Sequence, residues 1–139
     1  MAMAQKTVSI SKDISVFYVE ADSFPEGIET ARERFKKLIG QNSGRELYGI
    51  SRPENNKIIY RVGAEEEFNG EGKKYNCHSL GLKKGRYASL IIENYMENLG
   101  EIKKAFDLIL QRPDLDPLGY CVEKYLDEKE MICMVRLKD

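Results

Sequence analysis

The residues best suited to chemistry lie in one short stretch of the chain, Gly119–Leu126 (GYCVEKYL). Its aromatic and β-branched residues, with a proline before it and a charged turn after it, predict a β-strand. Because side chains alternate along a strand, Cys121, Glu123 and Tyr125 would share one face. A carboxylate between a thiol and a phenol is unusual on a core-facing surface. It suits a site that holds a positively charged group, which aromatic rings also attract.

Plainer interpretations of the same residues stay open. Glu123 could form an ordinary cross-strand ion pair with Arg136 or Arg61. Cys121 is interpreted as a small hydrophobic residue and not as a nucleophile, because the sequence places no base for it.

Composition limits the function classes. The chain has 139 residues, 42% hydrophobic and 32% charged, and a net charge of −1. This predicts one soluble domain, 1–139, and argues against direct nucleic-acid binding, which needs a basic surface. No apolar run is long enough to span a membrane, and the N-terminus lacks the pattern of a signal peptide, so we expect a cytoplasmic protein.

The cysteines and the histidine point to no catalytic pair and no metal. Cys77, Cys121 and Cys133 are an odd, scattered set, which predicts free thiols. Cys77 precedes the one histidine, His78, but no second ligand pair has a suitable spacing. We therefore expect no catalytic residue, no metal ligand and no cofactor.

The elements that must position these residues follow from apolar periodicity. Residues spaced three and four apart predict amphipathic helices over 25–39 and 99–111. Strands are predicted over 7–20, 47–51, 57–64, 85–93, 119–126 and 131–137, with 75–82 extended. The polar segment 65–74 is predicted to be an exposed loop with a solvated acidic run, Glu65-Glu66-Glu67.

The order strand, helix, strand, strand thus occurs twice, and the halves share a register. Five apolar positions of the first helix recur 71 positions later. They are Ile28, Ala31, Phe35, Leu38 and Ile39, followed by Leu99, Ile102, Phe106, Ile109 and Leu110. The same offset places Val16–Val19 on Tyr87–Leu90 and Leu47 on Leu118.

We therefore predict an α+β fold of two βαββ pseudo-repeats, approximately 7–65 and 76–138. Each antiparallel sheet would carry one helix on one face, the opposite faces would meet, and a central ligand cleft would lie at the pseudo-twofold axis. At the position equivalent to Glu123 the first half offers Ser51 or Arg52, so the carboxylate would come from one half only.

Several short motifs, taken in order, resemble a known family. They are FPEGI at 24–28, YRVGA at 60–64, KGRYA at 84–88 and CVEKYL at 121–126. The chain resembles, from about Val16 to Leu137, the GyrI-like or AraC-type effector-binding domain. This family occurs in multidrug-responsive transcription activators, in the gyrase-inhibitor protein and as single-domain proteins. The final hairpin is shorter than in the family, and the chain has no tryptophan.

The resemblance implies a set of ligand-binding residues. Glu123 matches the buried glutamate that meets the charge of lipophilic cations in the activators, and Tyr125 would share its face. Ile92 and Tyr95 fall in the segment between strand and helix that lines the site in such domains. Tyr48 is the residue expected from the first half.

The expected function is binding of a small hydrophobic, cationic molecule without turnover. Met1–Ser11 is too short for a helix-turn-helix region, so we expect a stand-alone ligand-binding module related to regulator effector domains. Two alternatives are a small-molecule hydrolase with Glu123 as general base and a cleft tyrosine as its helper, and a protein-binding module with a regulatory protein partner.

Overall fold

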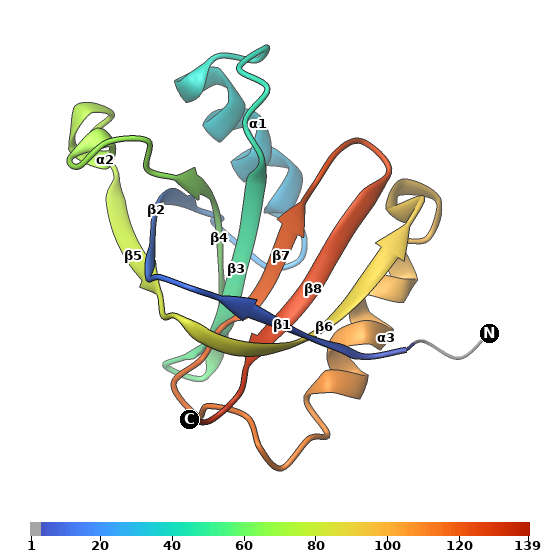
Figure 1. Cartoon of the computed structure of the whole chain (residues 1–139). Helices are drawn as coiled ribbons and strands as arrows, with labels where there is room; N and C mark the ends of the chain where they lie inside the picture. Colours follow the sequence, from blue (N-terminus) through green and yellow to red (C-terminus); the bar gives the residue numbers. More distant parts are fainter. Residues whose placement is uncertain (1–3) are drawn as a thin grey trace. The chain divides into compact units, whose positions relative to one another are not determined.

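The computed structural model describes residues 4–139 (Figure 1), and these form two compact units. One unit combines the described part of 1–12 with Lys83–Asp139, and the other is Asp13–Leu82. Each consists mainly of antiparallel sheet with helices packed on it, in agreement with the predicted α+β class.

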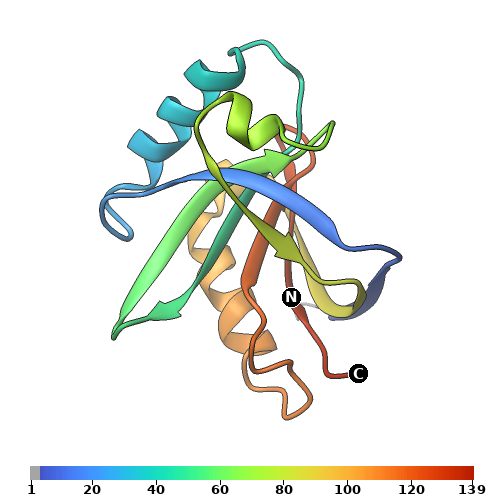
Figure 2. The same cartoon turned by 90° about the vertical axis from the view of Figure 1, so that its left-hand side faces the viewer.

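The unit Asp13–Leu82 places one long helix on a sheet ordered β3-β4-β2-β5. Its elements are β2 (Ile14–Glu20), α1 (Ile28–Ile39), β3 (Leu47–Glu54), β4 (Lys57–Glu65), α2 (Glu71–Lys74) and β5 (His78–Leu82). The apolar stripe of α1 packs against β2 and β4 (Figure 2), with Ala31 and Phe35 meeting Phe17 and Val62 in a buried core. The helix therefore forms where the predicted periodicity places it.

The other unit has its sheet in the order β1-β6-β8-β7. Its elements are β1 (Lys6–Ile10), β6 (Gly85–Glu93), the 3₁₀ turn η1 (Tyr95–Glu97), α3 (Leu99–Ile109), β7 (Cys121–Tyr125) and β8 (Glu130–Arg136). Helix α3 packs on β6 and β8, as Figure 1 shows, and buries Ala105 and Ile109 against them.

The predicted single strand over 7–20 is wrong, because the chain forms two strands there. Ser11, Lys12 and Asp13 interrupt it, and the first part, β1, pairs with β6 while β2 pairs with β4 and β5. Apolar residues on both faces of this segment hide the interruption, since alternation alone cannot mark a short polar break inside a strand.

The prediction of an exposed loop over 65–74 is also wrong. The segment contains α2, and the Glu71 side chain is only 3% exposed. Arg45 donates two hydrogen bonds to that carboxylate, at 2.7 and 2.9 Å, and the Glu67 amide donates a third at 2.8 Å. Glu66 accepts hydrogen bonds from Ser15 and from a backbone amide of α2, so the acidic run is not simply solvated.

The strand registers correct the predicted counterpart of Glu123. Val19 pairs with Val62 and Leu90 with Cys133, so these two ladders correspond at the 71-residue offset. Val62 pairs on its other side with Gly49, whereas Cys133 pairs with Glu123. If the 71-residue offset is carried through these ladders, the position that matches Glu123 is Gly49, and not Ser51 or Arg52.

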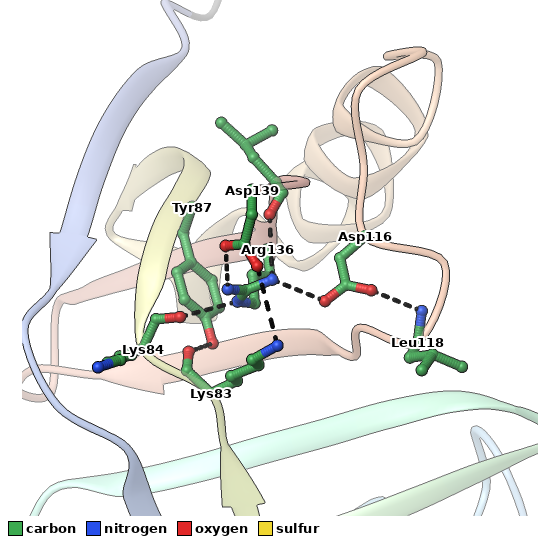
Figure 3. Close-up of polar contacts among 8 residues, drawn as sticks. Lys83, Lys84, Tyr87, Asp116, Leu118, Arg136 and Asp139 are labelled. Atoms are coloured by element: carbon green, nitrogen blue, oxygen red, sulfur yellow. Dashed lines mark hydrogen bonds and ion pairs between the residues drawn. The ribbon is translucent and has the colours of Figure 1, made fainter.

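A buried arginine ties the C-terminal residues to two connections of its unit (Figure 3). Arg136 Nε donates to the Lys84 carbonyl at 2.9 Å, Nη1 to Asp116 at 2.9 Å and Nη2 to Asp139 at 2.7 Å. A backbone amide and the arginine hold the pKa of Asp116 below its ordinary value. Tyr87 donates to the Lys83 carbonyl at 2.6 Å and so fixes the same turn.

Glu71→Gln should lower the free energy of unfolding at pH 7 by about 2 kcal/mol, because a buried ion pair loses one partner. The Arg45 hydrogen bond holds the pKa of Glu71 below 4.5, so its contribution is complete above that pH and is lost as pH falls through the folded-state pKa. Urea unfolding from pH 7 to pH 3 should show the wild type losing its advantage over the variant below about pH 4.5. Glu67→Gln is the control, since that side chain is 67% exposed. A Glu71→Gln variant as stable as this control at pH 7 would contradict the assignment.

Gly85→Ala should destabilise the fold, because a Cβ there would lie 2.8 Å from Arg136 Nη2 and the backbone has a φ of +136°. The hydrogen-bonded guanidinium cannot move without breaking its network, so we expect a loss of about 2 kcal/mol in chemical denaturation. Gly100→Ala is the matched comparison, since nothing lies within 4 Å of a Cβ there and the position is helical. That variant should be neutral or slightly stabilised, and a Gly85→Ala protein of equal stability would argue against the constraint.

Candidate functional site

The hairpin β7–β8 positions the predicted site strand. Asp127 Oδ1 accepts hydrogen bonds from the amides of Lys129 and Glu130, both at 2.7 Å, and this closes the turn. The resulting register pairs Tyr125 with Met131 and Glu123 with Cys133. A short polar turn thus determines which side chains surround the carboxylate.

Glu123 lies in a grid of nine positions formed by β7, β8 and β6 on one face of the sheet. The rows are Tyr125–Met131–Ile92, Glu123–Cys133–Leu90 and Cys121–Val135–Ala88. Apart from Glu123 and the tyrosine, its members are hydrocarbon or sulfur side chains. Glu123 is therefore the one charged side chain of these nine.

This grid occupies the face on which α3 packs. Ala88, Leu90, Ile92, Met131, Cys133 and Val135 belong to the core that contains Ala105 and Ile109 of α3. Cys121 and Tyr125 pack against that core, and they are half-buried, as is Glu123. The predicted alternation along the strand is observed, but it directs the carboxylate to the helix side of the sheet. The expectation that Glu123 lies on a sheet face away from the helices, in the predicted cleft, is therefore wrong.

Two tyrosines support the carboxylate. Tyr125 donates a hydrogen bond of 2.6 Å from its hydroxyl to Glu123 Oε1. The Tyr95 ring meets Tyr125 edge to face, with centroids 5.2 Å apart, and the Tyr95 hydroxyl donates to the Asp127 carbonyl at 3.2 Å. Tyr95 therefore links the hairpin turn to the residue that orients Glu123.

The five residues predicted to bind a ligand differ in their burial, and they belong to two different units. Ile92 is 3% exposed and Tyr95 is 8% exposed, so both lie deeper than the half-buried Glu123 and Tyr125. These four belong to the same unit. Tyr48 belongs to the other unit, where it pairs with Gly63 on the sheet face away from α1. A ligand-binding role for each of the five stays a prediction.

The sequence reasoning missed two features of these faces. Cys133 was counted only as a thiol, although the turn at 127–129 sets the pairing that places it opposite Glu123. On the α1 face of the other sheet, Phe24 stacks on the buried Tyr60 with centroids 5.6 Å apart and stays 41% exposed. The FPEG turn was assigned only to starting the helix, so no signal singled out this aromatic pair.

The charge of Glu123 acts on both neighbouring thiols, which are free, as predicted. Burial and that charge raise the pKa of Cys121 to about 11. Burial, Glu123 and Cys121 together raise the pKa of Cys133. Burial alone raises the pKa of Cys77, which packs in the other unit.

The arginines suggested as ordinary ion-pair partners have other roles. Cys133 pairs with Glu123, and Arg136 lies on the other face of the same strand, so its side chain points away from both. Arg136 forms ion pairs with Asp116 and Asp139 instead. The predicted alternative of a cross-strand ion pair between Glu123 and Arg136 is therefore wrong. The guanidinium of Arg61 forms ion pairs with two other carboxylates: Nη1 lies 3.0 Å from Glu54 Oε2, and Nη2 lies 3.7 Å from Glu20 Oε1.

Comparison with known proteins identifies the fold class. No family model matches the chain, and no curated protein matches it. Solved structures do match, at 11–12% identity, so the likeness concerns the fold.

Three of these structures cover nearly the whole chain. SAV2435 bound to tetraphenylphosphonium has a TM-score of 0.70 at 12% identity over 98% of this chain and 94% of its own. An integron cassette protein from the mobile metagenome of Vibrio cholerae has 0.67 at 11% identity over 96% and 95%. A putative transcription regulation protein from Staphylococcus aureus MU50 has 0.64 at 11% identity over 99% and 100%.

Two negative findings apply to residues 4–139, the part of the chain that the structure describes. No helix there combines the length and apolarity needed to cross a membrane. No group of three or more His, Cys, Asp or Glu side chains there is spaced to hold a metal ion.

Glu123→Gln should lower the pKa of Cys121 from about 11 toward 9, without reaching it, because burial is the larger of the two causes. The titration can be followed by the pH dependence of alkylation, with the modified cysteine identified by peptide mass spectrometry. Cys77 is the internal control, since its pKa is raised by burial alone and should not change. An unchanged Cys121 titration would show that the carboxylate does not act on this thiol.

Proposed function

We propose that this chain is an effector-binding domain of the GyrI-like type that binds small hydrophobic cations. The observation that carries the proposal is the position of Glu123, a half-buried carboxylate among eight uncharged side chains on the helix-covered face. We further propose that the whole chain is one such domain built from two βαββ pseudo-repeats.

The physical basis is the cost of a carboxylate in apolar surroundings. Taking a charged group out of water is costly unless an opposite charge or hydrogen bonds compensate it. The Tyr125 hydroxyl donates one hydrogen bond of 2.6 Å to Glu123. A lipophilic cation would be attracted by the carboxylate, its apolar groups would bury surface beside the half-buried Cys121, and the Tyr125 ring would add about 0.5–2 kcal/mol of cation–π attraction.

The structural relatives support the same ligand class. SAV2435 was solved with tetraphenylphosphonium, a lipophilic monocation with four aromatic rings. The Staphylococcus aureus relative is described as a putative transcription regulation protein. At 11–12% identity these names describe those proteins, and they support the proposal only through the shared fold.

The arrangement favours binding over hydrolysis. A hydrolase would use Glu123 as general base, but its Oε1 already accepts a hydrogen bond of 2.6 Å from Tyr125, which makes that oxygen a weaker acceptor for a substrate proton. The pKa of Cys121 is about 11, so this thiol stays protonated at neutral pH and is no ready nucleophile. A regulatory protein that senses the ligand-bound domain is the partner we propose.

Glu123→Gln should weaken binding of methyltriphenylphosphonium by about tenfold to a hundredfold, because the variant keeps the shape and loses the charge. Binding of triphenylphosphine oxide, which carries the same three rings without a net charge, should change less than about threefold. Isothermal titration calorimetry measures both. Glu128→Gln, on the exposed turn after β7, is the matched control and should bind as the wild type does.

Equal cation affinity in Glu123→Gln and the wild type would refute the charge role. Turnover of an activated small substrate that is lost in Glu123→Ala would favour the hydrolase alternative. A stoichiometric protein complex that forms without regard to ligand would favour the protein-binding module.

A further inference from the structure

Arg61 is a buried guanidinium that lacks one hydrogen-bond partner. It lies on β4 between Tyr60 and Val62, which belong to the core under α1, so its side chain points to the opposite face of the sheet. That side chain is only 8% exposed. Its Nε has no hydrogen-bond partner among residues 4–139. Native structures pair nearly all such buried donors, because leaving one without an acceptor is costly.

The buried arginine of the other unit, Arg136, provides a direct comparison. It is 5% exposed, and all three of its guanidinium nitrogens donate hydrogen bonds, Nε to the Lys84 carbonyl at 2.9 Å. The same type of side chain at the same depth is thus fully paired elsewhere in this chain. The missing partner of Arg61 Nε is therefore specific to its site.

The positive charge of Arg61 is already balanced. Nη1 lies 3.0 Å from Glu54, at ion-pair distance but without hydrogen-bond geometry, and Nη2 lies 3.7 Å from Glu20. Arg52 Nε lies 3.2 Å from the same Glu54 oxygen. Burial lowers the pKa of Arg61, but Glu54 and Tyr18 outweigh this effect and raise it, so the guanidinium stays charged. Two guanidinium groups thus face two carboxylates, and the site lacks an acceptor for Nε and not a negative charge.

The corner of the sheet that holds Arg61 is open at its edge. In the described part of the chain, β5 pairs with β2 only as far as His78 and Tyr18, so Glu20 at the end of β2 has no strand beyond it. The Glu20 side chain is 53% exposed. The half-buried Tyr18 presents its ring 5.3 Å from Arg61 Cζ, and its partner Gly63 places no side chain beside it. An aromatic ring packed on Tyr18 can therefore bring a substituent past Glu20 to the guanidinium.

We propose that Arg61 binds an uncharged aromatic compound that carries an acceptor oxygen, such as the carbonyl of a tertiary benzamide. The Nε–H would donate to that oxygen, and the ring of the compound would lie against Tyr18. A charged donor makes this hydrogen bond stronger than one between neutral groups. The ligand class differs from the one proposed for Glu123, and Arg61 belongs to the other unit. The inference therefore does not rest on the proposed function.

The test is nuclear magnetic resonance of the arginine Nε–H groups in the full chain, each assigned through bonds from its own backbone. Titration with N,N-dimethylbenzamide at pH 7 should shift the Arg61 Nε–H signal downfield, because this proton gains an acceptor. The Arg136 Nε–H already has its acceptor, so it is the internal reference and should not move. Benzoate has the same ring with a negative charge, and it should bind at least about tenfold more weakly because Glu54 and Glu20 repel it.

Arg61→Lys keeps a positive charge near Glu54 but has no Nε–H, so it should weaken binding of N,N-dimethylbenzamide by about tenfold. Glu123→Gln should leave this affinity unchanged, whereas it should weaken binding of methyltriphenylphosphonium, so either proposal can fail without the other.

Three results would overturn the inference: an Arg61 signal that does not move, an Arg61 signal that moves only together with that of Arg136, or benzoate that binds as tightly as the amide. The first would assign the Nε–H to a bound water molecule. Because the wild-type spectrum carries the test, the result holds even if Arg61→Lys does not fold.

Discussion

The structure around the site depends on one electrostatic constraint: a carboxylate placed on the helix-covered face of a sheet. Such a charge is costly in apolar surroundings, and the chain limits the cost in two ways. Glu123 stays half-buried, and the Tyr125 hydroxyl donates to it at 2.6 Å. A carboxylate beside an apolar surface is the combination that a lipophilic cation complements.

The precision of this arrangement comes from the hairpin that carries it. Asp127 closes the turn with two hydrogen bonds of 2.7 Å, and Tyr95 binds the Asp127 carbonyl while its ring packs on Tyr125. A shift of one residue in the β7–β8 register would turn Glu123 to the opposite face. The turn, the aromatic pair and the carboxylate consequently form one connected set, in which a remote turn residue determines the surroundings of the charged group.

Much of this could be predicted from the sequence, and the failures have physical reasons. The spacing of Phe35 and Phe106 identified both long helices, because burial on one side of a helix leaves a periodic signal. The alternation around Glu123 identified the residues that share its face, but not that α3 packs on that face, because Val122 on the opposite face of the strand is buried as well. The break at Ser11–Asp13 was missed because apolar residues on both faces of that strand remove the contrast. The fold of 65–74 was missed because it depends on Arg45, which lies 26 positions before Glu71. Pairing between distant polar residues has no periodicity to detect.

The carboxylates of Glu71, Asp116 and Glu123 accept hydrogen bonds from different kinds of donor. Glu71 is held by Arg45 and Asp116 by Arg136, in each case with a guanidinium nitrogen within 2.9 Å. An arginine neutralises the carboxylate that it binds and fixes it in a closed, fully paired network. Glu123 Oε1 instead accepts a hydrogen bond from the Tyr125 phenol, a neutral donor whose ring meets Tyr95 edge to face. A phenol orients a carboxylate through one short bond, whereas a guanidinium can engage both of its oxygens. The β7 carboxylate is therefore tied to an aromatic pair and a hairpin turn, whereas each arginine network joins segments 20 or more positions apart in the sequence.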